Sequence, residues 1–245
     1  MSKNTTLVAI IAGIVGLVAG FMLANSLNRS ELASRTLAAP TATPAAMASD
    51  PGAGAPTLTP DEIKAKIESA DRNPTDFSFQ KGLGLSLYRY ASLKQDAALL
   101  PDTIRIMQRA LNLDSADRDL LIGLGNAHFD VGYFNKDNQS FERSREFYNK
   151  ALARVPADAD VRTDLALTYY LQQPPDLDRA VAEFEKGLEV NPKHERSLQF
   201  LVQTYAKKND TAKATAALER LRAVNPANPA LTELASIASG KTPPQ

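Results

Sequence analysis

The sequence predicts an all-α protein in which helical hairpins stack side by side into a right-handed α-solenoid. The first observation behind this prediction is that helix-forming runs end at Pro74, Ser115, Pro156, Pro192 and Pro226. Proline lacks a backbone N–H and clashes with the preceding turn, so it ends helices. The steps between these positions are 41, 41, 36 and 34 residues. Stops at such steady intervals indicate a repeated structural unit.

The second observation is a pair of residues that recurs inside each unit, a large apolar residue followed by a mostly small one. The pairs are Leu83-Gly84, Leu124-Gly125, Leu165-Ala166 and Leu201-Val202. A small residue on the packing face of a helix lets a partner helix approach closely. We therefore expect each unit to be two helices that pack against each other at this pair.

The third observation is a motif, which is most complete in the third unit. It consists of Leu165-Ala166, Tyr169, Ala180, Phe184 and Pro192. This pattern resembles the tetratricopeptide repeat. The resemblance implies four hairpins, at residues 75–115, 116–156, 157–192 and 193–228. The motif tryptophan is missing from every unit, and His128 replaces the motif tyrosine in the second.

Capping helices complete the predicted repeat domain, which spans residues 61–240. Residues 61–72 read as a leading half-unit, with Thr59 as N-cap and Pro60 at the first helical position. Residues 230–239 read as an end helix that covers the last repeat, and 241–245 form a tail. The first two units each contain seven extra residues. Their equal lengths favour longer helices that pack on each other, with a loop as the alternative.

An apolar segment precedes the repeats. Leu7–Ala24 is an uncharged run of 18 residues, about 27 Å as a helix, which nearly spans a bilayer core. We expect residues 1–28 to be a single uncleaved transmembrane anchor, with a cleaved signal peptide as the alternative. Ala12, Gly16 and Gly20 share one helix face and could join two anchors into a homodimer, although small residues are common in such helices.

Residues 29–60 are rich in Ala, Pro and Thr and show no apolar period, which predicts a disordered linker. Positive charge is nearly balanced between Lys3 on one side of the anchor and Arg29 and Arg35 on the other. The count therefore gives little orientation. The very short N-terminal tail favours an extracytoplasmic, periplasmic location for the repeats.

Composition argues against several classes of function. The 28 Lys+Arg balance 28 Asp+Glu, which disfavours nucleic acid as a partner. There are no Cys and only two His. We expect neither His to have the carboxylate and Ser partners of a catalytic site. We therefore expect no metal site, no cofactor and no enzyme activity. The glycines of residues 81–86 and 122–128 lie inside predicted helices with no strand before them, which disfavours a phosphate loop.

A partner-binding surface is what remains. The tetratricopeptide resemblance implies a concave groove built from the first helix of each unit. The residues expected there are Lys81, Leu85, Tyr88, Asn126, Phe129, Leu167, Tyr170 and Gln203. The three aromatics occupy equivalent places in successive units. They either line the groove or fill the seam between helices, and the sequence leaves both open. Only Lys81 matches the carboxylate clamp of chaperone-binding members.

These features predict a membrane-tethered protein–protein interaction scaffold that binds a partner protein or peptide. The layout resembles bacterial accessory proteins of cytochrome c maturation and of the export translocon, which implies assembly of envelope complexes. A structural anchor that only self-associates is the alternative.

Overall fold

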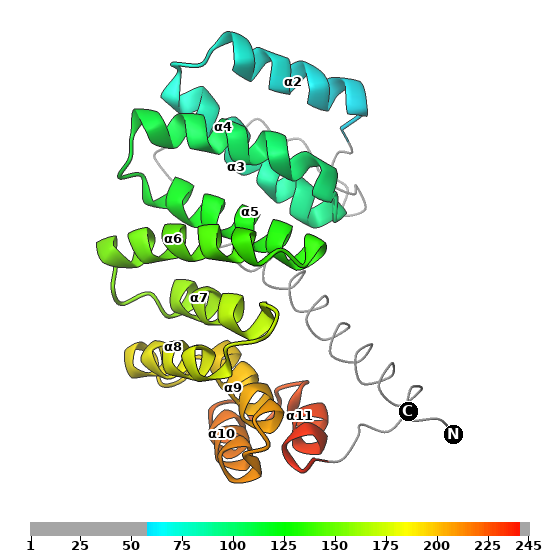
Figure 1. Ribbon diagram of the computed structural model, residues 1–245, viewed down its shortest axis with the longest axis vertical. Coiled ribbons are helices and arrows are strands. Elements are labelled where there is room, and N and C mark those ends of the chain that lie inside the picture. Colours follow the sequence, from blue (N-terminus) through cyan, green and yellow to red (C-terminus); the bar gives the residue numbers. More distant parts are fainter. Residues whose placement is uncertain (1–57, 241–245) are drawn as a thin grey trace, which may run out of the picture.

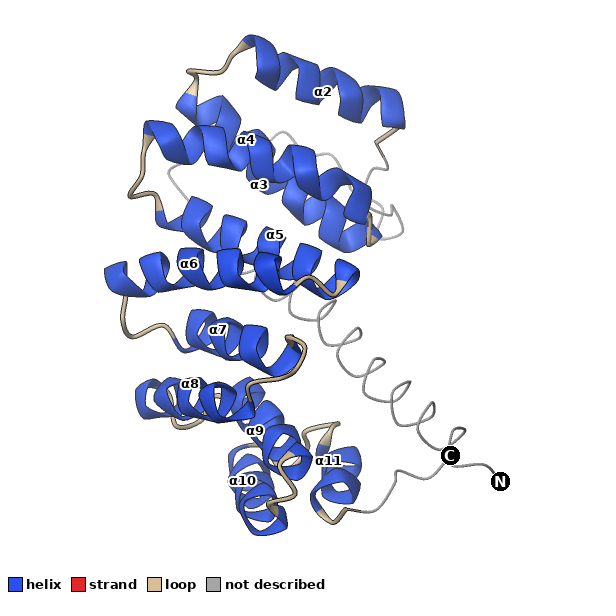
Figure 2. Ribbon diagram, viewed as in Figure 1, coloured by secondary structure: helices blue, strands red, loops and turns tan. Residues whose placement is uncertain are grey.

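The computed structural model describes residues 58–240, and these form α-helices, one 3-10 helix and turns (Figure 2). The elements in order are α2 (Pro60–Arg72), α3 (Phe77–Lys94), η1 (Ala97–Leu99), α4 (Leu100–Leu113), α5 (Arg118–Asn135), α6 (Asn138–Arg154), α7 (Ala159–Leu171), α8 (Leu177–Val190), α9 (Glu195–Lys207), α10 (Thr211–Val224) and α11 (Leu231–Ala238). The predicted anchor with Ala12, Gly16 and Gly20, most of the linker and the tail lie outside the described residues. No helix within residues 58–240 is both long and apolar enough to cross a membrane.

Four hairpins, α3–α4, α5–α6, α7–α8 and α9–α10, stack in chain order, with α2 at one end and α11 at the other (Figure 1). The second helix of each hairpin also packs on the first helix of the next. The first helices α3, α5, α7 and α9 contact one another in succession. In residues 58–240 the second helices do not pack together in this way. The first helices therefore line the inner side of the stack, which has the solenoid architecture that the sequence predicts.

Aspartate begins most of the helices. The side chains of Asp76, Asp117 and Asp158 accept hydrogen bonds from the backbone N–H three residues later, at the starts of α3, α5 and α7. Such caps satisfy amide groups that have no partner within the helix. Thr59 and Glu62 form a reciprocal capping box before α2, with bonds of 2.7 and 3.2 Å. The predicted cap at Thr59 is thus confirmed.

Small residues sit where two helices touch. A Cβ atom on Gly84 would lie 2.6 Å from the Cγ atom of Met107 on α4. On Gly125 it would lie 2.6 Å from the Tyr148 ring on α6. Ala166 is fully buried at the equivalent place on α7. These contacts confirm, for the first two hairpins, that the small residue permits close approach of the partner helix.

The two long hairpins differ in how they accommodate their extra residues. Helices α3 and α5 have 18 residues, against 13 in α7 and α9. In the second hairpin α6 also lengthens, to 17 residues. In the first hairpin α4 has only 14 residues and the short helix η1 precedes it. The expectation of two lengthened helices is therefore right for the second hairpin and wrong for the first, where Pro101 fixes the start of α4.

Candidate partner-binding surface

The residues predicted to bind a partner lie at three equivalent positions of the first helices. These positions come five, nine and twelve residues after each N-cap, and the N-caps are Asp76, Asp117, Asp158 and His194. Residues spaced three or four apart lie on one face of a helix. The prediction therefore places the whole set on the inner side of the stack.

Lys81, at the fifth position of α3, is held by two carboxylates of α5. Its Nζ atom lies 2.6 Å from Asp117 and 2.9 Å from Asp119. Desolvation alone would lower the pKa of Lys81, but the hydrogen bonds and charges of the two aspartates together raise it. Lys81 is therefore a charged bridge between neighbouring first helices.

The same position forms bridges further along the stack. Thr163 Oγ1 lies 3.3 Å from His194 Nδ1, and Gln199 donates a 3.1 Å hydrogen bond to Asn228. His194 is the N-cap of α9, and Asn228 lies three residues before the start of α11. The fifth position is thus used chiefly to fasten one repeat to the next.

The aromatic row divides between the groove and the seam. Phe129 and Tyr170 are only 6% and 3% exposed. Phe129 stacks edge-on against Phe141 at 5.6 Å, and Tyr170 against Phe200 at 6.0 Å. Burial raises the pKa of Tyr170 to about 12. These contacts favour the seam alternative for both residues, because a ring packed between helices offers little area to a ligand.

Tyr88 is more accessible than Phe129 and Tyr170. It is half-buried, and its hydroxyl group donates a 2.9 Å hydrogen bond to Asp130 on α5. One turn earlier on the same helix, Leu85 is also half-buried. Together with Lys81 they form the accessible part of the predicted surface, which we call the α3 face.

The ninth positions beyond α3 are mostly buried. Leu167 and Gln203 are 3% and 5% exposed, and Asn126 is 9% exposed. Asn126 accepts a 2.8 Å hydrogen bond from the Tyr148 hydroxyl group. The structure thus concentrates accessible groups on α3, whereas the set predicted from the sequence extends over α3, α5, α7 and α9.

The sequence analysis predicts no carboxylate and Ser partners for His194, and this prediction is wrong. Its Nε2 atom lies 3.1 Å from Asp160 and its Nδ1 atom 2.8 Å from the Ser197 hydroxyl group. The carboxylate comes from the preceding repeat, so helical spacing around His194 could not reveal it. The order Asp–His–Ser is that of a catalytic triad. However, Ser197 is fully buried and its Oγ atom lies 2.6 Å from Thr163 Oγ1, so this network fastens α7 to α9 and is closed to a substrate.

A buried ion pair adjoins this network. Arg196 of α9 lies 2.6 Å from Asp164 of α7, and both side chains are nearly inaccessible. Burial lowers the pKa of Arg196 to about 10. Asp158 caps the start of α7, whereas Asp164 pairs across the repeat. In the described part of the chain, no three His, Asp or Glu side chains are placed to hold a metal ion.

Helices α2 and α3 line an open groove with a volume of about 490 Å³ that the sequence did not indicate. Its lining is largely apolar and consists of Leu58, Lys66, Ser78, Phe79, Gly82, Leu83, Ser86, Leu87 and Tyr90. The Tyr90 hydroxyl group donates to the Leu58 carbonyl at 3.2 Å, which closes one side. A volume of this size suits a few side chains of a bound segment.

Comparisons with known proteins agree with this architecture. Residues 175–236 match the family model described as tetratricopeptide repeat. No curated protein matches the sequence. The fold is similar to a crystal structure of MamA, with a TM-score of 0.54 and 19% identity over 67% of this chain and 87% of that one.

Two further structures share the fold. "MamA 41-end from Desulfovibrio magneticus RS-1" has a TM-score of 0.55 and 15% identity over 69% of this chain and 86% of that one. A thermophilic tetratricopeptide protein of Thermus thermophilus, TTC0263, has a TM-score of 0.53 and 16% identity over 72% of this chain and 88% of that one. At such identities the likeness concerns the fold.

Proposed function

Since residues 58–240 have the tetratricopeptide fold, we propose that this protein is a non-catalytic scaffold that binds a segment of a partner protein on its inner side. The observation that carries the proposal is the α3 face, where Leu85 and Tyr88 stay partly accessible beside the fixed charge of Lys81. An aliphatic and an aromatic side chain beside polar groups are the composition of a protein interface. The buried inner residues Phe129 and Tyr170 support the α3 face indirectly, because their contacts fix the spacing of the helices.

The proposal includes a tether to a membrane. Its support is the uncharged run Leu7–Ala24, followed by the Ala/Pro/Thr-rich residues 29–60. As a coil, the 25 residues 36–60 of this linker would span roughly 25–30 Å, which would keep the repeats close to the bilayer. We place the repeats on the extracytoplasmic side, with the assembly of envelope complexes as their setting. Pairing through Ala12, Gly16 and Gly20 would bring two scaffolds together.

Site-specific photocrosslinking in living cells tests the proposal. A photoreactive benzoylphenylalanine replaces Leu85 on the α3 face or, as a matched control, Leu113, which is 45% exposed at the end of α4. We expect a crosslinked product of one defined partner from position 85 and none from position 113. Equal products from both positions would contradict a partner on the inner side. A product of twice the chain mass alone would instead support a self-associating structural anchor.

A further inference from the structure

Two arginines from different hairpins converge on one tyrosine ring. The guanidinium carbon of Arg145, on α6, lies 4.6 Å from the ring centroid of Tyr169 on α7. The guanidinium carbon of Arg179, on α8, lies 5.7 Å from the same centroid. Both distances are within the range of a cation–π contact. The ring of Tyr169 thus holds two positive charges near each other at the boundary between the second and third hairpins.

Within residues 58–240 no carboxylate forms an ion pair with Arg145, and Glu142 and Asp176 act on it only from a longer distance. Its Nη1 atom donates to the neutral oxygens of Gln172, at 3.2 Å, and Thr168, at 3.4 Å. Within residues 58–240 no Asp or Glu oxygen lies within 4.0 Å of it, although other partly buried arginines, such as Arg162 and Arg196, have such a partner. Desolvation lowers the pKa of Arg145, and the charge of Arg179 adds to this effect, against the charges of Tyr169, Glu142 and Asp176.

Arg179 is also available to a ligand. Its side chain is 70% exposed, and its shortest distance to Asp176 is 3.4 Å, from the Nε atom. The two terminal nitrogens of a guanidinium group form a donor fork, the geometry that receives a carboxylate through two parallel hydrogen bonds. An anion between the two guanidinium groups would relieve their mutual repulsion.

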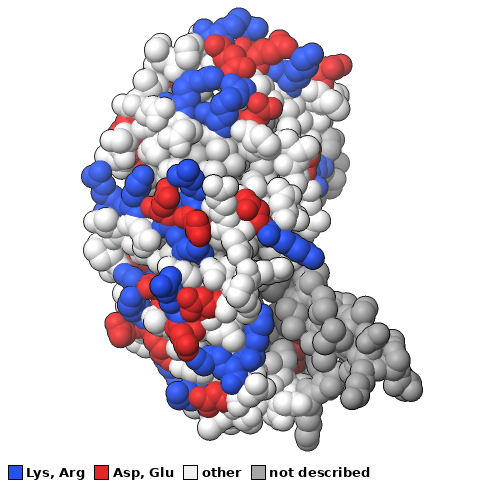
Figure 3. Space-filling view, in the orientation of Figure 1, with Lys and Arg blue, Asp and Glu red and all other residues white. Residues whose placement is uncertain are grey.

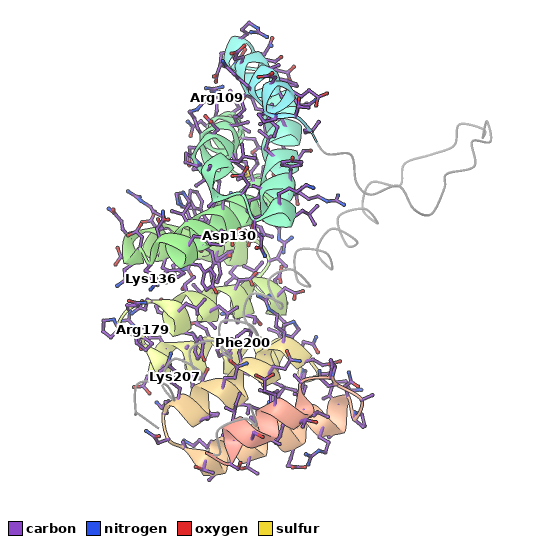
Figure 4. The ribbon with its side chains drawn as sticks, turned by 90° about the vertical axis from the view of Figure 1, so that its right-hand side faces the viewer. Arg109, Asp130, Lys136, Arg179, Phe200 and Lys207 are labelled. Atoms are coloured by element: carbon purple, nitrogen blue, oxygen red, sulfur yellow. The ribbon has the colours of Figure 1, made fainter. Side chains whose placement is uncertain are left out.

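Similar groups continue along this side of the stack. The Lys207 ammonium lies 4.7 Å from the ring centroid of Tyr170. Desolvation lowers the pKa of Lys207, and no carboxylate of the described chain offsets this effect. Figure 4 shows Lys136, Arg179 and Lys207 on the same side of the ribbon, near the turns between first and second helices. Phe134, two residues before Lys136, is 46% exposed. We call the surface formed by Phe134, Lys136, Arg145, Tyr169, Arg179 and Lys207 the hairpin-turn edge.

We propose that the hairpin-turn edge binds an acidic segment of a protein partner, with an aspartate or glutamate carboxylate held between Arg145 and Arg179. Arginine and aromatic side chains are enriched in the energetic centres of protein interfaces, and the edge combines both. A lipid surface or a nucleic acid would require a broad basic face. Figure 3 instead shows both signs of charge interspersed over the second helices, so the cations of the hairpin-turn edge are local. This surface is separate from the α3 face and does not depend on it.

A binding assay with a defined probe tests the proposal. The full chain, kept in a nonionic detergent, is titrated into fluorescein-labelled hexaglutamate at about 50 mM salt, where screening is weak, and anisotropy is measured. We expect Arg179→Gln and Arg145→Gln to weaken binding at least about tenfold, because each removes a charge-assisted pair. Arg145→Lys keeps the charge but loses the fork and should weaken binding several-fold.

Arg143→Gln is the matched control. It removes the same charge from the same helix, but Arg143 is exposed and pairs with Glu146 at 3.3 Å. We expect it to change affinity by less than about twofold, as for a solvated surface pair. Melting curves identify any variant that fails to fold, and Arg179→Gln, at an exposed position, keeps the test valid if Arg145→Gln does not fold.

Three results would overturn the proposal. One is the absence of hexaglutamate binding, or equal binding of hexaglutamine. Another is an equal loss in Arg143→Gln and Arg179→Gln, which would show attraction by overall charge. The third is displacement of the peptide by an equal concentration of inorganic phosphate, which would assign the cluster to small anions. A negative result in this peptide-binding assay would not affect the crosslinking test of the α3 face.

Discussion

At the scale of single residues, two glycines in first helices have opposite surroundings. A Cβ atom on Gly125 would meet the buried Tyr148 ring at 2.6 Å, whereas a Cβ atom on Gly82 would have nothing within 4 Å. Alanine is favoured over glycine inside a helix by about 1 kcal/mol, so only packing can make the two substitutions differ in sign. This pair therefore separates packing from helix propensity.

We predict that Gly125→Ala lowers the free energy of unfolding by about 1–3 kcal/mol, because the Tyr148 ring cannot move without breaking its bond to Asn126. Gly82→Ala should raise it by about 0.5–1 kcal/mol. Urea denaturation of both variants gives the two values. Equal effects would show that close approach does not explain the small residue of each unit.

His128 replaces a motif tyrosine and stacks on Phe147, with ring centroids 5.6 Å apart. Desolvation lowers the pKa of His128, and the charge of Arg143 adds to this effect. The unfolded chain therefore binds the proton more tightly than the folded chain. The stability contributed by neutral His128 is present above the ordinary histidine pKa of about 6.5 and is lost as pH falls through and below it.

His128→Tyr should weaken this pH dependence, since Tyr169 and Tyr205 occupy the equivalent positions of later repeats. The measurement is the urea midpoint at pH 7.5 and at pH 5.5 for both proteins. We expect a smaller decrease in the variant. An unchanged decrease would assign the acid sensitivity to other groups.

At the scale of elements, α11 determines how the stack ends. It packs on both helices of the last hairpin, and Leu234 and Ala238 are buried there. Leu231 and Ile237, also predicted to cover the repeat, are half-buried. A terminal helix of this kind shields an apolar face that the next repeat would otherwise cover.

Removal of residues 229–245 should lower the free energy of unfolding by a few kcal/mol, because re-exposing each buried aliphatic side chain costs about 1.5–3 kcal/mol. Thermal unfolding followed by circular dichroism provides the measurement. Removal of the tail 241–245 alone is the control and should change little. An unchanged melting temperature after the longer deletion would contradict a docked end helix.

At the scale of the whole molecule, the repeat domain forms a continuous stack, and each hairpin is joined to the next on the inner side. Lys81 with Asp117 joins the first two hairpins, and Asp164 with Arg196 joins the last two. Such neighbour contacts couple the repeats, so the domain should unfold in few steps. The proposed anchor is separable from this stack.

We predict that the full chain stays in the membrane fraction after carbonate washing, and that a chain beginning at Thr57 is soluble and folded. The reason is that residues 58–240 contain the whole hydrophobic core described here. Fractionation and circular dichroism are the measurements. A mature N-terminus near residue 27 together with soluble protein would rule out an uncleaved anchor.

The repeat can be derived from the amino-acid sequence alone. Helix stops, N-cap residues and small contact residues act within one or two turns of the chain, so their spacing is visible as a period. Gly84, Gly125 and Ala166 are found at helix contacts for this reason. The all-α solenoid and its four hairpins followed from these local signals.

The accessibility of the inner residues, in contrast, depends on how the hairpins pack against one another. Tyr88, Phe129 and Tyr170 are equivalent along the chain, yet their exposure depends on the neighbouring repeats, whose sequences differ. The contacts of His194 with Asp160 and of Arg145 with Tyr169 join residues 34 and 24 positions apart on different hairpins. No helical period links such residues, because their distance is set by how one hairpin packs on the next.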